Sequence, residues 1–149
     1  MSEASQLKNA TLDHAEVMMC IDPGVHTGFA VWQGGRLVRC ETGRACQVER
    51  AILEYAPASA HVLFEDARLR TWFGSKGREA LQGAGSIKRD CSRWQEWLEH
   101  HGYSYTAMPP QKGGTKWPPE LFARLTGWEG RTSEHARDAA ALGWRWGAK

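Results

Sequence analysis

The sequence lacks the features that mark secreted, membrane and repeat proteins. It has no apolar run long enough to cross a bilayer, and its first sixteen residues are polar, without the hydrophobic segment of a secretion signal. Internal repeats and low-complexity tracts are absent as well. We therefore expect a cytoplasmic protein with no membrane partner.

Cysteine is too sparse and too scattered to indicate a zinc site. The four cysteines form no C-x-x-C pair, and no histidine stands at a zinc-type spacing from them. The sequence also gives no reason to expect an organic cofactor. We expect free, buried thiols at Cys20, Cys40, Cys46 and Cys91.

Length and charge narrow the possibilities further. A chain of 149 residues has room for one domain with a single sizeable core. The net charge is only +2, but residues 1–66 carry five Lys/Arg against nine Asp/Glu, whereas residues 67–116 carry nine against four. An acidic metal site beside a basic, phosphate-binding surface would produce this asymmetry, and ordinary variation in surface charge explains it equally well.

Strands and helices alternate along the chain. Hydrophobic runs bounded by Gly and Pro predict strands, and apolar residues at helical spacing predict helices. The expected strands are 17–21, 27–32, 36–40, 62–64 and 103–108. The expected helices are 48–55, 86–101, 119–125 and 134–146, the last capped by Ser133, whereas 67–85 suggests a mobile loop or a frayed helix start.

The order of these elements predicts an α/β fold. A Gly34-Gly35 hairpin makes the first three strands antiparallel, and a helix before the fourth strand makes it parallel to the first. The result is a mixed five-stranded sheet with helices on both faces, which is the ribonuclease H-like arrangement. We expect this domain at 17–147, after a polar N-terminal extension at 1–16.

Acidic residues follow two strands that we expect to be neighbours. Asp22 ends the first strand before Pro23-Gly24, and Glu65 ends the fourth. Asp66 is a competing acid, but adjacent strand residues point to opposite faces and only one can join Asp22; we favour Glu65. Taken alone, Asp22 also fits an ordinary Asx turn, and Glu65-Asp66 fits a solvated strand cap.

The last helix adds two polar residues at a spacing of i, i+3. Ala139, Leu142 and Trp146 define its expected buried stripe, with His135 on it and Asp138 at its margin. Each has an ordinary alternative, because Asp is favoured near a helix N-terminus and inward histidines are common in cores. Together with Asp22 and Glu65 they bring acids from three elements to one end of the sheet, which suits Mg²⁺.

Three motifs carry a resemblance to a known family. Ile21-Asp22-Pro23-Gly24 followed by Thr27-Gly28, the strand-terminal Glu65, and His135-x-x-Asp138-Ala139 resemble the RuvC family of Holliday-junction resolvases over residues 17–147. The spacing from Asp22-Pro23-Gly24 to Thr27-Gly28 is one residue shorter than in the cellular form, which fits a compact, phage-type member. The resemblance implies a structure-selective DNA endonuclease that cuts four-way junctions with two Mg²⁺ ions, with Mn²⁺ able to substitute. It also implies an active-site and metal-ligand set of Asp22, Glu65, His135 and Asp138.

Basic residues after Glu65 are expected to hold DNA through its phosphates. Trp72 or Phe73 would stack on an unstacked base, as the resemblance suggests, or pack beneath a loop. A two-fold branched substrate suits a homodimer. The expected phosphate contacts are Arg68, Arg70, Lys76, Arg78, Lys88, Arg89, Arg93, Lys112 and Lys116.

Three other functions share parts of this pattern. An RNA·DNA hybrid nuclease would have the same fold and metals, and a non-catalytic protein could bind branched DNA with the same basic surface. A nucleotide-binding fragment of the actin-like ATPase fold is the third alternative. The length of the chain argues against that fragment, because the ATPase fold needs two domains to enclose its nucleotide.

Overall fold

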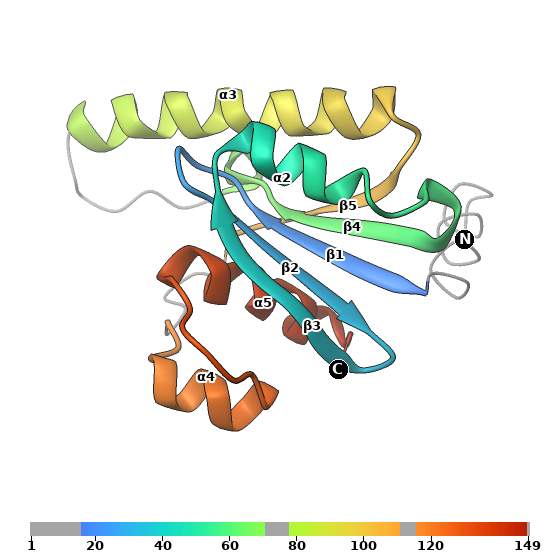
Figure 1. Ribbon diagram of the computed structural model, residues 1–149. Helices are drawn as coiled ribbons and strands as arrows, with labels where there is room; N and C mark the ends of the chain where they lie inside the picture. The colour runs from blue at the N-terminus through green and yellow to red at the C-terminus, as the bar shows by residue number, and fades with distance from the viewer. Residues whose placement is uncertain (1–15, 71–77, 111–115, 149) are drawn as a thin grey trace, which may run out of the picture.

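A computed structural model describes residues 16–70, 78–110 and 116–148, which form a five-stranded sheet with helices packed against it (Figure 1). Two short 3-10 helices, η1 (Pro57–Ser59) and η2 (Ala67–Leu69), connect some of the larger elements. The strands are β1 (Val17–Asp22), β2 (Thr27–Gln33), β3 (Arg36–Gly43), β4 (Ala60–Glu65) and β5 (Ser104–Met108). The helices are α2 (Ala45–Ile52), α3 (Arg78–His100), α4 (Pro119–Thr126) and α5 (Glu134–Trp146).

The sheet has the predicted mixed topology, with strand order β3-β2-β1-β4-β5. β1 and β2 pair antiparallel, as do β2 and β3, through a tight turn in which Gly34 and Gly35 adopt positive φ. β4 lies parallel to β1, and β5 lies parallel to β4. The predicted ribonuclease H-like α/β architecture is therefore confirmed.

Side-chain alternation along the strands gives the sheet two cores, one on each face. Met19 and Ile21 of β1 pack with α2 and α3, whereas Cys20, between them, packs toward α5. Figure 1 shows α2 and α3 on one face and α5 on the other. Helices thus cover both faces, as predicted.

The helix α3 is longer than the sequence suggested. It begins at Arg78, whereas the prediction placed its start at Ser86 and left the residues before it as a loop or frayed end. Gly83 and Gly85 lower helix propensity in this stretch, which explains the error. Ile87 is 41% exposed and does not belong to the buried stripe of α3.

The buried face of α5 is built from small residues and also differs from the prediction. Trp146, which was expected on this face, is 38% exposed, and the buried residues are Ala136, Ala139, Ala140, Leu142 and Gly143. The helix lies so close to the sheet that a Cβ at Gly143 would come within 2.4 Å of the Trp32 indole. Close packing thus selects small side chains and leaves the large indole at the helix end outside.

Three of the four cysteines are buried free thiols, as expected, but Cys46 is exposed. Cys46 lies on α2, whose buried face consists of Val48, Ala51 and Ile52. Its thiol therefore faces away from the sheet. None of the helices described here is long and apolar enough to span a membrane.

Candidate active site

The central strands bring Asp22 and Glu65 to the same edge and the same face of the sheet. Ile21 pairs with Phe64, so Asp22 and Glu65 each follow this pair by one residue. Cys20 and Leu63, two residues before them, both pack on the α5 side. Because side chains two apart in a strand share a face, both carboxylates point toward α5.

The first turns of α5 supply the third carboxylate and an imidazole. Ser133 caps the helix by accepting a hydrogen bond from the Ala136 amide at 3.1 Å. Nδ1 of His135 lies 3.6 Å from Oδ2 of Asp22. The sequence placed His135 on the buried stripe, but its side chain is 49% exposed. The helix turns Ala136 toward the sheet instead, so His135 lies at the rim of the site beside Asp22.

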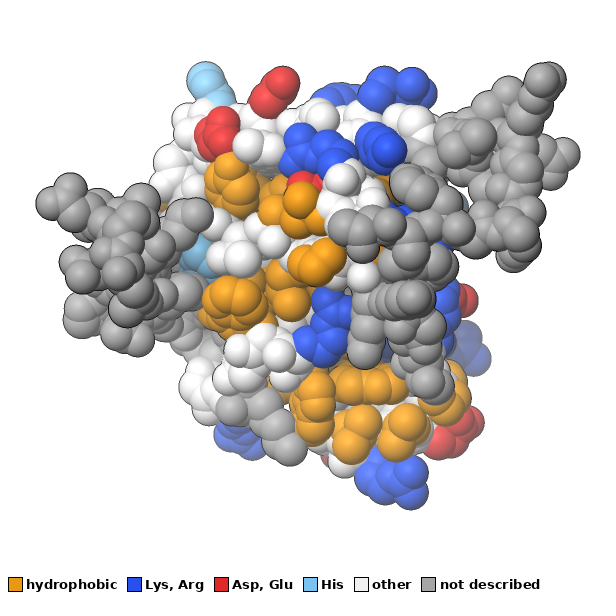
Figure 2. Space-filling model, turned by 180° about the vertical axis from the view of Figure 1, so that it is seen from behind, with side chains coloured by type: hydrophobic (Ala, Val, Ile, Leu, Met, Phe, Trp, Pro, Cys, Tyr) orange, Lys and Arg blue, Asp and Glu red, His pale blue; other side chains and the backbone are white. Residues whose placement is uncertain are grey.

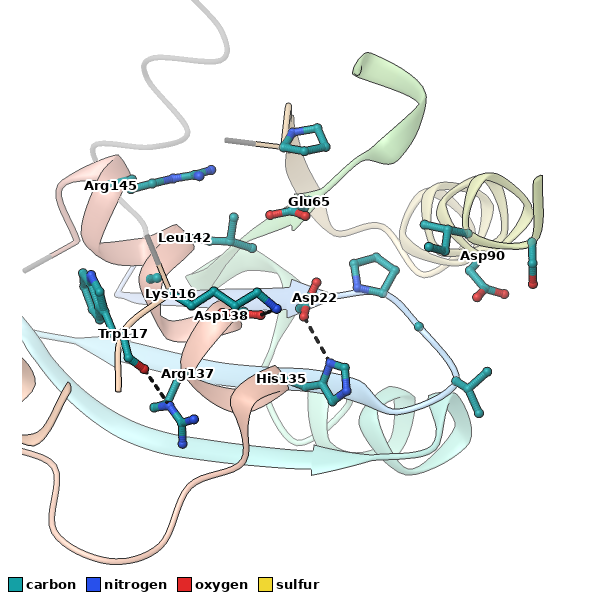
Figure 3. A pocket seen from close by; sticks show the side chains of 17 residues that line it. Asp22, Glu65, Asp90, Lys116, Trp117, His135, Arg137, Asp138, Leu142 and Arg145 are labelled. Carbon is teal, nitrogen blue, oxygen red and sulfur yellow. Dashed lines mark hydrogen bonds and ion pairs between the residues drawn. The ribbon is translucent and has the colours of Figure 1, made fainter. Parts of the chain in front are cut away.

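These side chains line a single open pocket of about 800 Å³. Figure 3 shows Asp22, Asp138 and His135 near one another, with Glu65 projecting from the end of β4. The far wall belongs to α3, through Ser86, Ile87 and Asp90. The structure thus brings all four predicted active-site residues to one cavity.

Negative charge is concentrated in this pocket. The pKa of Asp22 is raised from 3.8 to about 8, first by burial and then by the charges on Glu65 and Asp138. Burial is also the main reason why the pKa values of Glu65 and Asp138 are raised. Three carboxyl groups that resist ionisation together form a site suited to a cation.

Lys116 supplies positive charge within the pocket. Its ammonium group pairs with Glu134 and lies 3.8 Å from Oδ2 of Asp138. Its charge acts to lower the pKa of Asp22, Glu65 and Asp138, but burial outweighs it in each case. The sequence analysis expected Lys116 to contact DNA, and it gave no indication that this residue lies among the acids.

The chemistry of the donor set fits Mg²⁺, which prefers carboxylate oxygens. Among the described residues, however, no three His, Cys, Asp or Glu side chains lie close enough together to form a ready-made ion site. Asp22, Glu65 and Asp138 line one pocket but do not converge on one point. Binding of an ion by all three would therefore require their side chains to rotate.

The neighbouring acid, Asp66, has a structural role. It is 2% exposed and points to the opposite face from Glu65, where Arg68 donates to its two oxygens from Nε at 2.9 Å and Nη2 at 2.8 Å. The Arg68 guanidinium also donates to Ser92 and Gln95 of α3. The guanidinium of Arg68 thus anchors η2 to α3, and a contact between Arg68 and DNA stays a prediction.

Those of the other predicted DNA contacts that the structure describes lie outside the acid site. Figure 2 shows Lys and Arg side chains gathered over α3, and Arg89 and Arg93 of this helix are exposed. Arg93 lines a small hollow that shares Gly24 and Asp90 with the main pocket. Arg70 is exposed and Lys88 is half-buried. Trp72, Phe73, Lys76 and Lys112 fall outside the described residues, as does the side chain of Arg78.

Several pocket residues were not identified from the sequence. Asp90 and Ile87 belong to a helix far from the acidic motifs in the chain, and no local pattern marks them. Trp117 and Arg145 also line the pocket. Trp117 directly follows Lys116, and Arg145 lies two helical turns after Asp138. Nearness to these two residues was the signal in the sequence that could have identified them as pocket residues.

The strand order and the helices on both faces give this chain a ribonuclease H-like α/β fold. A RuvC from T. thermophilus, solved in complex with a Holliday junction substrate, has a similar structure, with a TM-score of 0.55 and 17% sequence identity. The alignment covers 89% of this chain and 97% of that one. No protein-family profile and no curated protein sequence matches. At this identity the likeness establishes a shared fold.

Proposed function

We propose that the protein is a divalent-metal-dependent endonuclease that cuts branched DNA, and four-way junctions in particular. The observation that carries this proposal is the arrangement of Asp22, Glu65 and Asp138, which reach one pocket from three separate elements. The structural likeness to a RuvC bound to a Holliday junction supports branched DNA as the proposed substrate. The pocket and the acids support the chemistry.

Asp22, Glu65 and Asp138 would hold two Mg²⁺ ions, for which Mn²⁺ could substitute, with His135 as a fourth ligand. When bound, such ions activate a water molecule and stabilise the departing oxygen at phosphorus. If His135 does not ligate metal, its place beside Asp22 allows it to orient the phosphate or to move a proton. Lys116 balances carboxylate charge and can contact a phosphate oxygen.

Basic residues beside the pocket would hold the arms of the junction through their phosphates, so binding should weaken with salt. Arg93 on α3 lines the small hollow next to the pocket, and Arg89 is exposed on the same helix. A homodimer would present two pockets to a two-fold symmetric junction. Further proposed DNA contacts are Arg70, Trp72, Phe73, Lys76, Arg78, Lys88 and Lys112.

The first test is the substitution Asp22→Asn, assayed on a synthetic four-way junction with Mg²⁺ and with a chelator. We expect cutting to fall by at least about a thousand-fold, because a metal ligand is lost. Junction binding should be equal or tighter, because one negative charge near phosphate is removed. Glu96→Gln, an exposed carboxylate on α3, is the matched control and should cut normally.

Two results would contradict the proposal in different ways. Cutting by Asp22→Asn at the normal rate would remove Asp22 from the active site. Tight junction binding by the wild-type protein without any cleavage in Mg²⁺ or Mn²⁺ would identify a non-catalytic binder. The same assay should include an RNA·DNA hybrid. Faster cutting of the hybrid than of the junction would identify the protein as a hybrid nuclease.

A further inference from the structure

We propose that Trp117 and Arg145 form a nucleotide subsite beside the acids. In this subsite the Trp117 indole stacks on an unpaired base next to the cut, and Arg145 contacts the adjoining phosphate. The inference rests on the proposed nuclease function and names the part of the substrate that one end of the pocket recognises.

The pocket extends well beyond the acids. At about 800 Å³ it falls in the range of cavities that enclose a whole organic ligand, and so exceeds what metal ions and one phosphate need. Away from Asp22, its wall is formed by Pro110, Trp117, Leu142 and Arg145. Figure 3 shows Trp117 and Arg145 on the side of the acids opposite α3. This wall offers aromatic and aliphatic surface together with a cation.

The Trp117 ring is held in place before any ligand arrives. It meets Trp144 edge-on, with ring centroids 5.5 Å apart, and lies 6.2 Å from Phe122. Its backbone carbonyl accepts a hydrogen bond from Nε of Arg137 at 3.0 Å, and Arg137 is itself bound to Thr132. The half-buried indole is therefore a rigid surface that loses little entropy on binding.

Arg145 places positive charge at the same end of the pocket. It is exposed and lies on α5 two turns after Asp138, so both residues are on the same side of the helix. Arg145 and Glu65 line the same pocket, so the arginine adds positive charge to the cavity that holds this carboxylate. A DNA strand with one phosphate at the acids would therefore reach Arg145 with its next phosphate.

An indole beside an arginine is the combination that holds single-stranded nucleotides, by stacking and by phosphate contact. A paired base within a duplex stays stacked on its neighbours and cannot use such a surface. The subsite would therefore favour positions where a base is unpaired, as at a branch point. It would contribute to the choice of substrate as well as to affinity.

The test measures binding of Trp117→Leu and wild type to an intact junction and to junctions that lack a base on either side of the cut. Binding is measured in a chelator, so that cleavage does not intervene. We expect Trp117→Leu to bind the intact junction about five- to a hundred-fold more weakly. Loss of the recognised base should weaken the wild type equally, and the variant should show no further loss on that abasic junction.

Two matched variants separate stacking from stability. Trp117→Phe keeps an aromatic face and should retain most of the binding. Trp128→Leu alters the same aromatic cluster outside the pocket and should still discriminate between intact and abasic junctions. Arg145→Gln provides an independent measurement, because its defect should disappear on a junction with a neutral methylphosphonate at the contacted phosphate. Thermal melts of each variant confirm that it is folded.

The outcomes distinguish the two proposals. Binding of the intact junction by Trp117→Leu at wild-type affinity would overturn the subsite. So would losses of affinity from the substitution and from the abasic site that add independently. In either case, junction binding by the wild type would leave the proposed function in place. Failure of the wild type to bind any branched DNA would overturn both. Coupled losses at one abasic position support the subsite and identify the base.

Discussion

At the scale of single residues, Asp22 links the active site to the stability of the fold. Its pKa rises from 3.8 to about 8 on folding, so the folded protein retains a proton that the unfolded chain releases. The stability associated with this proton is complete below about pH 4 and is lost as the pH rises through about 8. Without a bound cation, ionisation of Asp22 therefore destabilises the folded state.

We predict that Asp22→Asn is more stable than the wild type at alkaline pH. In chelator near pH 8 we expect the free energy of unfolding to rise by up to about 5 kcal/mol, because the pKa of Asp22 rises from 3.8 to about 8 and each pKa unit corresponds to about 1.4 kcal/mol. Near pH 4 the difference should vanish. Denaturant unfolding across this pH range measures it, with Glu96→Gln as the control. A difference that does not grow with pH would show that Asp22 ionises freely in the folded protein.

The adjacent acids Glu65 and Asp66 show which residue roles the sequence could predict and which it could not. Strand alternation correctly indicated that only one of them could join Asp22, and the pairing of β1 with β4 selects Glu65. The sequence could not show that Arg68 holds Asp66 with two hydrogen bonds, because that contact depends on where η2 turns the chain. Arg68 was consequently predicted to contact DNA, although its guanidinium already donates hydrogen bonds to Asp66, two residues earlier.

At the scale of elements, the Thr27-Gly28 pair determines how closely α5 approaches the sheet. The Thr27 hydroxyl donates to the carbonyl of Gly24 at 3.0 Å and closes the turn after Asp22. A Cβ at Gly28 would lie 2.0 Å from the carbonyl oxygen of His135 and 3.2 Å from the amide of Ala136. These are backbone atoms, so any side chain here would push the first turn of α5 outward.

We therefore predict that Gly28→Ala damages both stability and cutting. Displacing α5 should lower the free energy of unfolding by about 1–3 kcal/mol. It should also reduce cutting, because His135 and Asp138 move away from Asp22 and Glu65. Gly85→Ala on α3 is the matched control, since its Cβ meets nothing within 4 Å and alanine favours helix. Unfolding and junction cleavage are measured for both variants; normal behaviour of Gly28→Ala would show that α5 can shift without harm.

The elements also show which patterns can be misread. Alternating strands and the Gly34-Gly35 turn were predicted well because period-2 burial and turn chemistry are local properties. The buried stripe of α5 was predicted correctly at Ala139 and Leu142 but wrongly at Trp146 and His135, which are exposed. Its Ala and Gly content was the better indication, since small residues permit the close approach at Gly143.

At the scale of the whole molecule, the described part of the chain gathers its three site carboxylates in one pocket at one end of the sheet. Cutting a four-way junction symmetrically requires two strand scissions, and hence two such pockets. We predict that two chains bind each junction, with both cuts made at equivalent positions. Native mass measurement of the complex in chelator, with cut mapping on labelled strands, tests this. One chain per junction, or a single cut, would contradict it.

The sequence predicted this arrangement only in part. The acidic first half and basic middle of the chain anticipated an acid pocket beside a basic helix. Lys116 in the middle of the acids was not anticipated, because Lys116 and Asp138 lie far apart in the sequence and only the folded structure brings them together. Contacts between distant segments are set by the assembled fold, and no local pattern reports them.

The pairing of Ile21 with Phe64 has a consequence for how such a protein can vary. A slip of one residue between these strands would present Asp66 to the cavity and carry Glu65 to the opposite side, toward Arg68. The position of both carboxylates in the pocket thus depends on the hydrogen-bonded ladder at the centre of the sheet. Loops around the rim can lengthen or change composition freely, whereas a single insertion within either central strand would dismantle the acid cluster.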